Sequence, residues 1–453
     1  MSDTRDPRGT CLTRTAARID AATPPHRDRA VDALRALAIL GVVLGHWLVT
    51  ALVADGDTLR ATSPLASMPW LAPVSWTFQT LAVFFMVGGH VATRSYAAAR
   101  GGGRERGEGR TDGSGREPSR EAQGHPRGVY ARWLWARLTR LFRPVAALVG
   151  VWLTVAVCLL LGGASFVTVH TVVKLALSPL WFLLVFALLT AATPLLARLS
   201  PLWPLVVVLH VDLVRFGLGG PAWLGWVNLV AGWAVPYTLG AAWTRGELEG
   251  RRAGWVLLTG GAVVTAVLVR WGGYPASMVG VPGEGVSNLN PPTLAAVAFG
   301  LAQCGPALLL RGRLRRAMRR PRAWAAVALL NLSAMTVFLW HQTALMTTTA
   351  LALPAGRLPG LHTRPDTWAW VPYRLLWLPA FALALGVCWA AFHGWETRAG
   401  RPEGGRDGEA VNPVTRSVPE QAEGARTSAH RPTGREHPLP RPETTALKGV
   451  GHA

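Results

Sequence analysis

Charged residues are scarce in this 453-residue chain, and lysine and cysteine are scarcer still. Only 16% of the residues are charged, whereas a soluble domain usually carries about 25%, and half of the chain is apolar. Many of the charges fall in a few polar stretches, which leaves long tracts with almost no charge. This distribution excludes an ordinary soluble globular enzyme.

The four cysteines lie far apart and show neither CxxC nor Cys/His spacing, so the sequence predicts no disulfide framework and no metal site. It also lacks GxGxxG, P-loop and HExxH motifs, and we expect no permanently bound cofactor. The net charge of +21 is almost entirely arginine, because Lys174 and Lys448 are the only lysines. Arginine between apolar tracts is typical of membrane topology, so no nucleic-acid partner is predicted.

Ten apolar tracts are close to the ~20 residues that a helix needs to cross a bilayer. Backbone groups in lipid must be hydrogen-bonded internally, so the sequence predicts an all-α, polytopic membrane bundle of about ten transmembrane helices. The fifth tract contains three ionisable residues and is the weakest. The predicted spans are 33–53, 74–93, 144–161, 179–196, 202–218, 223–243, 253–269, 293–310, 323–345 and 375–392.

Loop charge predicts the orientation of these spans. With the N-terminus inside, the inner loops hold 23 Lys and Arg residues and the outer loops hold 6, so both termini are predicted to be cytoplasmic. We expect a polar N-terminal segment at 1–32 and a membrane domain at 33–394. Low apolar content predicts disorder in an inner loop at 97–130 and in a cytoplasmic tail at 395–453.

The first span carries two candidate site residues, Arg35 and His46. Eleven residues of helix turn through three turns and about 20°, which places both side chains on one face about 16 Å apart. Arg35 lies at the inner end, where a cytoplasmic anchor is the simpler interpretation. An ionisable residue inside an apolar span usually faces a cavity and marks function, so His46 is the stronger candidate.

With these residues, the sequence resembles the bacterial membrane acyltransferase family 3, the integral-membrane O-acyltransferases that include O-antigen and Nod-factor acetylases. Asp32, Arg35 and His46 match the family's first-helix element, (I/V)DxLRAxA followed by a histidine. The segment 84–90, FFMVGGH, is similar to the family's FFxxSG(F/Y), with Gly88 in place of serine and His90 in place of the aromatic residue.

Three later segments extend the resemblance over about 29–395. Arg137 and Arg140 match an RxxR element before the third span, where anchoring and ligand binding are both open. His341, in FLWHQ, is similar to a late YLxH element and can be catalytic or a packing residue. The outer loop at 273–283 resembles a GYPxSMVGVPG segment of an actinobacterial-type subgroup, which can line an acceptor site or be a rigid loop. The tail at 395–453 does not resemble the family's SGNH esterase-like domain, so a stand-alone form is expected.

The resemblance implies an acyltransferase for groups other than aminoacyl groups, a multi-pass protein of a bacterial plasma membrane. Its donor would be cytoplasmic acyl-CoA, and its acceptor would be a hydroxyl of a carbohydrate or glycoconjugate at the outer side. Arg35, Arg137, Arg140 and Asp32 would bind the donor, and His46 and His341 would be catalytic. His46 would act as a general base or as a nucleophile that forms an acyl-histidine.

Besides an enzyme, two other classes of protein fit a polytopic membrane chain, a transporter or flippase and an inactive scaffold. A transporter or flippase would also use intramembrane His and Arg residues, but the chain shows no inverted repeat and almost no intramembrane carboxylate beyond Asp212. The third class is an inactive membrane scaffold. Acyl-CoA hydrolysis or transfer by the purified protein separates an enzyme from both.

Overall fold

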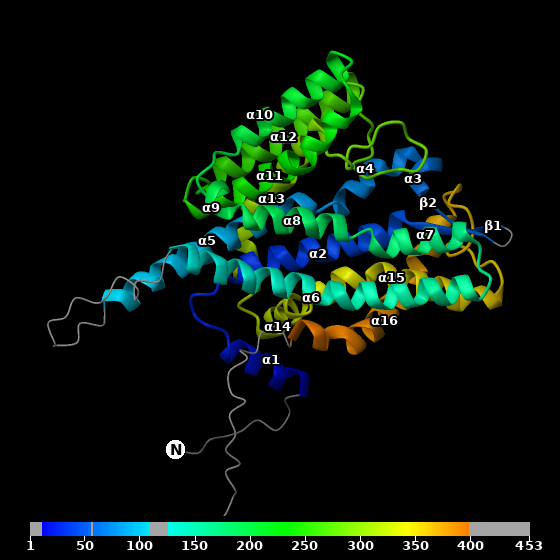
Figure 1. Cartoon of the computed structure of the whole chain (residues 1–453), viewed down its shortest axis with the longest axis horizontal. Coiled ribbons are helices and arrows are strands. Elements are labelled where there is room, and N and C mark those ends of the chain that lie inside the picture. Colours follow the sequence, from blue (N-terminus) through cyan, green and yellow to red (C-terminus); the bar gives the residue numbers. More distant parts are fainter. Residues whose placement is uncertain (1–10, 56–57, 109–125, 398–453) are drawn as a thin grey trace, which may run out of the picture. The chain divides into compact units, whose positions relative to one another are not determined.

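A computed structural model describes residues 11–55, 58–108 and 126–397 (Figure 1). In this part of the chain two short antiparallel strands, β1 (Ala51–Asp55) and β2 (Thr58–Thr62), pair with Ala51 opposite Thr62. Most other described residues are helical. The helices are α1 (Cys11–Ala21), α2 (Arg29–Val49), α3 (Pro64–Ser67), α4 (Ala72–Ser75), α5 (Leu81–Glu108), α6 (Pro126–Leu161), α7 (Phe166–Leu177), α8 (Leu180–Ala191), α9 (Thr193–Leu196), α10 (Leu202–Asp212), α11 (Gly225–Thr244), α12 (Arg251–Trp271), α13 (Leu294–Ala317), α14 (Pro321–Leu332), α15 (Ala334–Ala352) and α16 (Trp370–Thr397).

The prediction of an all-α polytopic membrane protein is confirmed. Among the described residues, seven helical segments are long and apolar enough to cross a membrane, and the bent pair α14 and α15 makes an eighth. The other two predicted spans are α10 and α11, which do not reach these limits. Helix α10 has only 11 residues before a π-helical stretch at Leu213–Gly217. Helix α11 is largely covered by protein, so it has less need of apolar side chains than a helix that faces lipid.

Several predicted boundaries differ from the structure. The first span ends at Val49, and residues 51–53 belong to strand β1. The N-terminal segment contains helix α1, and helices α5 and α6 extend into the inner loop that was predicted as disordered. Helix α16 continues through residues 395–397, beyond the predicted domain boundary. The rest of the predicted disorder, at 109–125 and 398–453, lies outside the described residues.

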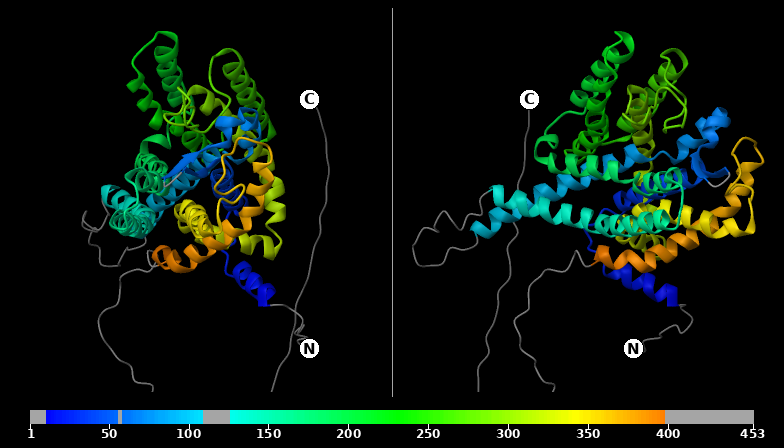
Figure 2. Two further views of the ribbon diagram at one scale, coloured as in Figure 1. Left: turned by 90° about the vertical axis from the view of Figure 1, so that its right-hand side faces the viewer. Right: turned by 45° about the vertical axis from the view of Figure 1, so that its right-hand side comes forward.

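Helix α2 packs against α5, α13, α14 and α15, so it contacts both of the main helical groups. Helices α10 to α13 pack together beside α5, and α6, α15 and α16 lie on the other side of α2 (Figures 1 and 2). Helix α8 contacts both α11 and α6. Helix α1 packs on α14, where Trp324 is buried and donates a hydrogen bond to Thr23 Oγ1 at 2.7 Å. Residues far apart in the sequence therefore meet around α2.

Glycines allow α5 and α11 to approach closely. A Cβ atom on Gly89 would lie 2.0 Å from the carbonyl oxygen of Tyr237, and one on Gly240 would lie 1.9 Å from that of Met86. A Cβ atom on Gly88 would lie 2.4 Å from the ring of Phe186, so little room is left there for the family's serine. The FFMVGGH segment thus serves helix packing.

Helices α14 and α15 are bent by 74° at a break. The first N–H groups of α15 have no partner within the helix, and such groups are costly to leave unpaired in a membrane. Glu396 on α16 accepts hydrogen bonds from the backbone N–H of Met335 at 3.2 Å and of Thr336 at 3.1 Å, and from Thr336 Oγ1 at 2.8 Å. Helix α16 thereby fixes the start of the helix that carries His341.

Candidate functional site

The structure brings His46 on α2 next to His341 on α15. Their ring centroids are 4.9 Å apart. The Nδ1 atom of His46 lies 2.9 Å from the carbonyl oxygen of Val42, and that of His341 lies 2.6 Å from the carbonyl oxygen of Phe338. Because a carbonyl oxygen can only accept, each Nδ1 carries a proton, and each neutral ring has its lone pair on Nε2. Trp47 donates from Nε1 to the carbonyl oxygen of His341 at 2.9 Å and ties the two helices together at this level.

His46 also lines a cavity of about 140 Å³. Its wall is mainly apolar and aromatic, and it comes from α2, α5, α8, α11, α13, α15 and the connections between helices. His341 is fully buried, and its Nε2 atom has no hydrogen-bond partner among the described residues. His46 is thus the histidine with access to a ligand. The large side chains on the wall are Phe78, Trp181, Phe182, Trp233, Met278, Phe299 and Phe338.

Two glutamines on the cavity wall were not predicted from the sequence. Gln79 donates from Nε2 to Ser75 Oγ at 3.0 Å, and Gln303 donates from Nε2 to the carbonyl oxygen of Trp76 at 3.0 Å. The Oε1 atom of each glutamine is buried and has no partner among the described residues. These two acceptors can receive hydrogen bonds from hydroxyl groups of a ligand. Glutamine carries no charge, so its position in the sequence gave no signal of function.

The loop between α12 and α13 contributes Met278, Val279 and Leu289 to the same cavity. Asn288 gives this loop its shape. Its Nδ2 atom donates to the carbonyl oxygens of Pro275 at 2.6 Å and Ser277 at 2.9 Å, and its Oδ1 atom accepts from Thr293 Oγ1 at 2.6 Å. The GYPxSMVGVPG segment is therefore internally bonded and lines the cavity, and its role at an acceptor site stays a prediction.

Asp212, one of the three ionisable residues that weakened the fifth predicted span, anchors this loop. Its carboxylate is buried and accepts hydrogen bonds from Asn228 Nδ2 at 2.9 Å, Tyr274 Oη at 3.0 Å and the backbone N–H of Leu294 at 2.6 Å. These partners lie on α11, in the loop and at the start of α13. The charge therefore joins three elements behind the cavity and does not face lipid.

Arg374 on α16 holds the end of α2 just beyond His46. Its guanidinium is buried and donates to the backbone carbonyl oxygens of Trp47 at 2.7 Å, Gly360 at 3.1 Å and Thr50. Carbonyl groups at the C-terminal end of a helix have no partner within it, and they attract a positive charge. Arg374 is one of the six Lys and Arg residues in the predicted outer loops, and in the structure it positions the end of α2 next to the site.

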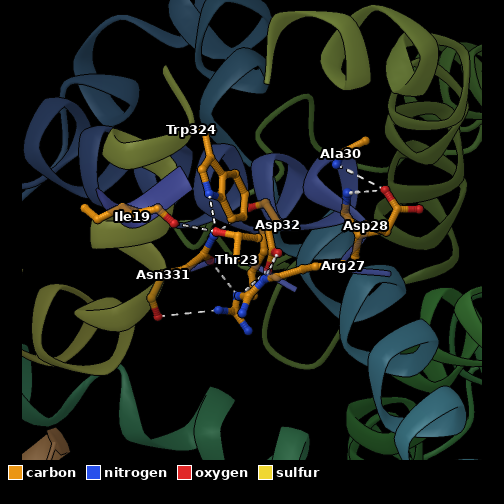
Figure 3. Close-up of polar contacts among 10 residues, drawn as sticks. Ile19, Thr23, Arg27, Asp28, Ala30, Asp32, Trp324 and Asn331 are labelled. Atoms are coloured by element: carbon orange, nitrogen blue, oxygen red, sulfur yellow. Dashed lines mark hydrogen bonds and ion pairs between the residues drawn. The ribbon is translucent and has the colours of Figure 1, made fainter. Parts of the chain in front are cut away.

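Asp32 lies at the opposite end of α2, close to Asn331 at the end of α14 (Figure 3). Arg35 follows three residues later on the same helix. Arg35 donates from Nε to Asn331 Oδ1 at 2.6 Å and from Nη2 to the carbonyl oxygen of Asn331 at 3.4 Å. Asn331 in turn donates to the carbonyl oxygen of Asp32 at 2.8 Å. The Asp32 carboxylate forms a two-pronged ion pair with Arg27, at 2.6 and 3.2 Å. Asp32 is thus bound to another side chain of the protein, and Arg35 retains one nitrogen, Nη1, without a partner in the described chain.

Arg137 and Arg140 lie on the inner half of α6 and complete the predicted set. Arg137 donates to Ser95 Oγ on α5 and lies over the ring of Trp133, 5.0 Å from its centroid. Arg140 is exposed, makes no hydrogen bond or ion pair within the described ranges, and is close enough to interact electrostatically with both Arg35 and Arg137. The three arginines therefore form one positively charged group.

The site thus has two parts, a histidine pair on a cavity near the C-terminal end of α2 and an arginine group nearer its N-terminal end. Within the described residues, no group of three or more His, Cys, Asp or Glu side chains could hold a metal ion. A family model described as an acyltransferase domain, that of acyltransferase family 3, matches residues 28–393, well over half of the chain. This chain is a member of that family.

The family membership makes the protein a membrane acyltransferase that transfers groups other than aminoacyl groups. The transporter and scaffold alternatives from the sequence are not supported. Comparisons with curated proteins and with solved structures found no match.

The backbone N–H groups of Gly88 and Gly89 lie in the interior of α5, where helical hydrogen bonds use them, so they are not free to stabilise an oxyanion.

Proposed function

We propose that this acyltransferase moves an acyl group from cytoplasmic acyl-CoA to a hydroxyl of a carbohydrate or glycosylated acceptor, at the outer side of the plasma membrane of a bacterium. One observation carries the proposal: His46 lines a cavity and has its basic Nε2 free of protein carbonyls, while His341 lies against it. A base placed this way can remove a proton from a ligand hydroxyl.

The cavity wall supports an acceptor rich in hydroxyl groups. Gln79 and Gln303 offer unpaired carbonyl oxygens, and Ser75 lies beside Gln79. The aromatic side chains around them provide flat apolar surface, against which a sugar ring or an acyl chain can pack. The loop charges predict that this end of α2 is the outer end, which is the reason to place the acceptor there.

The arginine group supports a phosphate-bearing donor at the inner side. A guanidinium binds phosphate through two parallel hydrogen bonds, and Arg35 and Arg140 both have unpaired N–H groups. Arg35 and His46 are separated by about 16 Å of helix, a distance that an extended pantetheine arm can span.

In the reaction, the acceptor oxygen attacks the thioester carbonyl carbon as His46 Nε2 takes the hydroxyl proton. The C–O bond forms, the C–S bond breaks, and the CoA thiolate leaves with the proton that His46 returns. His341 supports the ring of His46 from the protein side. The second route is attack by His46 itself, which gives an acyl-histidine before the acceptor arrives.

The test uses the full chain, purified in lipid nanodiscs, with labelled acetyl-CoA and a panel of methyl glycosides. We expect labelled ester, and CoA release beyond about one equivalent per protein, only when a suitable glycoside is present. Intact mass after a rapid quench without acceptor separates the two routes, since only the second leaves an acetylated protein. If inserted protein releases no CoA with acyl-CoA donors of any chain length, the proposed donor is wrong.

A further inference from the structure

A second cavity, of about 510 Å³, lies at the other end of α2. Asp28 and the residues around it contribute one side, α5 contributes another, and the end of α13 contributes a third. The lining is unusually basic, because six arginines and a single carboxylate face the same space. The arginines of this arginine cavity are Arg27, Arg29, Arg94, Arg311, Arg315 and Arg319.

The carboxylates nearby do not balance these charges. Asp28 accepts from Arg311 at 2.9 Å and lies 3.7 Å from Arg315. Burial raises the pKa of Asp28, but the hydrogen bond and charge of Arg311 outweigh it and hold the pKa below its usual value, so the group is ionised at neutral pH. Arg94 and Arg319 form no ion pair with any described residue. Arg27 pairs with Asp32 and Arg29 pairs with Asp20, so with Asp28 three carboxylates offset three of the six arginines. The cavity therefore keeps an excess of about three positive charges.

The arginine cavity is separate from the cavity of His46. Helices α2, α5 and α13 line both cavities, but with residues from different stretches of each helix. The stretches between are packed into one apolar cluster that includes Leu34, Met86 and Cys304, all of which are buried. A ligand in the arginine cavity is therefore blocked from His46 along these three helices.

We infer that the arginine cavity binds the phosphate groups of a ligand, at a site distinct from the one that serves the acyl donor. Guanidinium groups bind phosphate bidentately, and a partly enclosed cavity of one sign concentrates counter-ions of the other. The ligand needs at least two negative charges, which a lipid with anionic phosphate in its headgroup or a soluble phosphorylated compound supplies. The inference rests on this cavity and does not depend on the proposed acyl-CoA donor.

The experiment uses the purified full chain and a pair of charge-matched variants. Arg94→Gln/Arg319→Gln removes the two unpaired arginines of the cavity. Arg313→Gln/Arg316→Gln removes two exposed arginines of the same inner end that do not line it. One arm counts cardiolipin retained in phosphatidylcholine nanodiscs by native mass spectrometry, and the other measures pyrophosphate binding by calorimetry in pure phosphatidylcholine nanodiscs.

We expect the cavity variant to bind at least about tenfold more weakly in one arm, with the control variant unchanged. Loss in the cardiolipin arm assigns the site to lipid, and loss in the pyrophosphate arm assigns it to a soluble ligand. Equal binding by both variants and the unmodified protein in both arms overturns the inference. A rise in KM for acyl-CoA in the cavity variant, as large as that of Arg137→Lys, overturns the separation from the donor site. If the double variant fails to insert into the membrane, the single variant Arg319→Gln replaces it, because Arg319 lies beyond the end of α13.

Discussion

The imidazole rings of His46 and His341 lie 4.9 Å apart, on two helices from opposite ends of the chain. Each ring donates from Nδ1 to a carbonyl oxygen of its own helix, so both Nε2 atoms are basic. Only His46 reaches the cavity. This difference in access gives the two histidines different expected roles.

Replacing His46 with Gln should reduce acyl transfer by at least about 10²-fold, because the titratable nitrogen is lost while the size of the side chain is largely kept. His341→Gln should reduce transfer less, since His341 supports the base from a buried position. Steady-state rates on inserted protein, compared at equal expression, measure both. A larger loss for His341→Gln than for His46→Gln would show that the base is misassigned, and unchanged rates for both would remove the histidine mechanism.

Arg137→Lys should raise KM for acyl-CoA by about tenfold with little change in kcat, because lysine keeps the charge and loses the planar fork that holds phosphate. The matched control is Arg143→Lys, an exposed arginine one and a half turns further along α6. Equal KM values for the two variants would mean that Arg137 only anchors its helix to Ser95 and the membrane surface.

Arg374→Met should lower the stability of the protein by at least about 2 kcal/mol, because three backbone carbonyl groups lose charged hydrogen bonds. Thermal unfolding in detergent measures the change as a fall in Tm. The exposed Arg357→Met provides the control. We also expect a lower kcat at temperatures where the variant is folded, since the end of α2 that carries His46 is released. An unchanged Tm would rule out this positioning role.

A glycosylation site or a protease cleavage site inserted after Gly219 should be modified by an enzyme on the outer side of the membrane. Helix α11 is mostly buried between other helices, and α10 exposes large apolar residues such as Trp203 and Leu209, as a lipid-facing helix does. We therefore expect both to cross the membrane although they fall short of the limits for length and apolarity. A tag at Gly219 reached only from inside would mean eight crossings, and tags at Gly101 and Gly285 provide the inside and outside references.

Asp28→Asn should lower the Tm at pH 7, and the difference from the unmodified protein should shrink as the pH falls below 3.8. The pKa of Asp28 is lower in the folded protein than its ordinary value of 3.8, so the ionised carboxylate stabilises the fold above that value. This contribution is lost as the pH falls through the folded pKa. Asn keeps the N-cap of α2 and removes the charge that faces Arg311. The exposed Asp366→Asn is the control, and a pH-independent difference would contradict the electrostatic role.

The sequence predicted features that depend on one helix at a time. Arg35 and His46 lie on one continuous helix because the apolar run between them admits no break. The charge pattern also predicted that arginine-rich ends lie on the same side, and Arg29, Arg94 and Arg311 do meet at one cavity.

The sequence could not predict contacts between helices that are far apart along the chain. His341 was equally well explained as a packing residue until its neighbour was known. Gln79 and Gln303 are uncharged, so only their place on the cavity wall identifies them. The break between α14 and α15 was missed because 323–345 is predominantly apolar and reads as one span. Hydropathy does not report that Glu396, on another helix, accepts hydrogen bonds from the backbone N–H groups exposed at the break.

The bond from Glu396 to α15 also determines where the chain can be shortened. A protein ended at Phe392, after the last apolar residue of the predicted tenth span, would lose the carboxylate that caps Met335 and Thr336. A protein ended at Thr397 would keep it. Expression designs that remove the polar tail therefore need at least four residues beyond Phe392, and the shorter version would leave α15, with His341 on it, free to fray from its first turn.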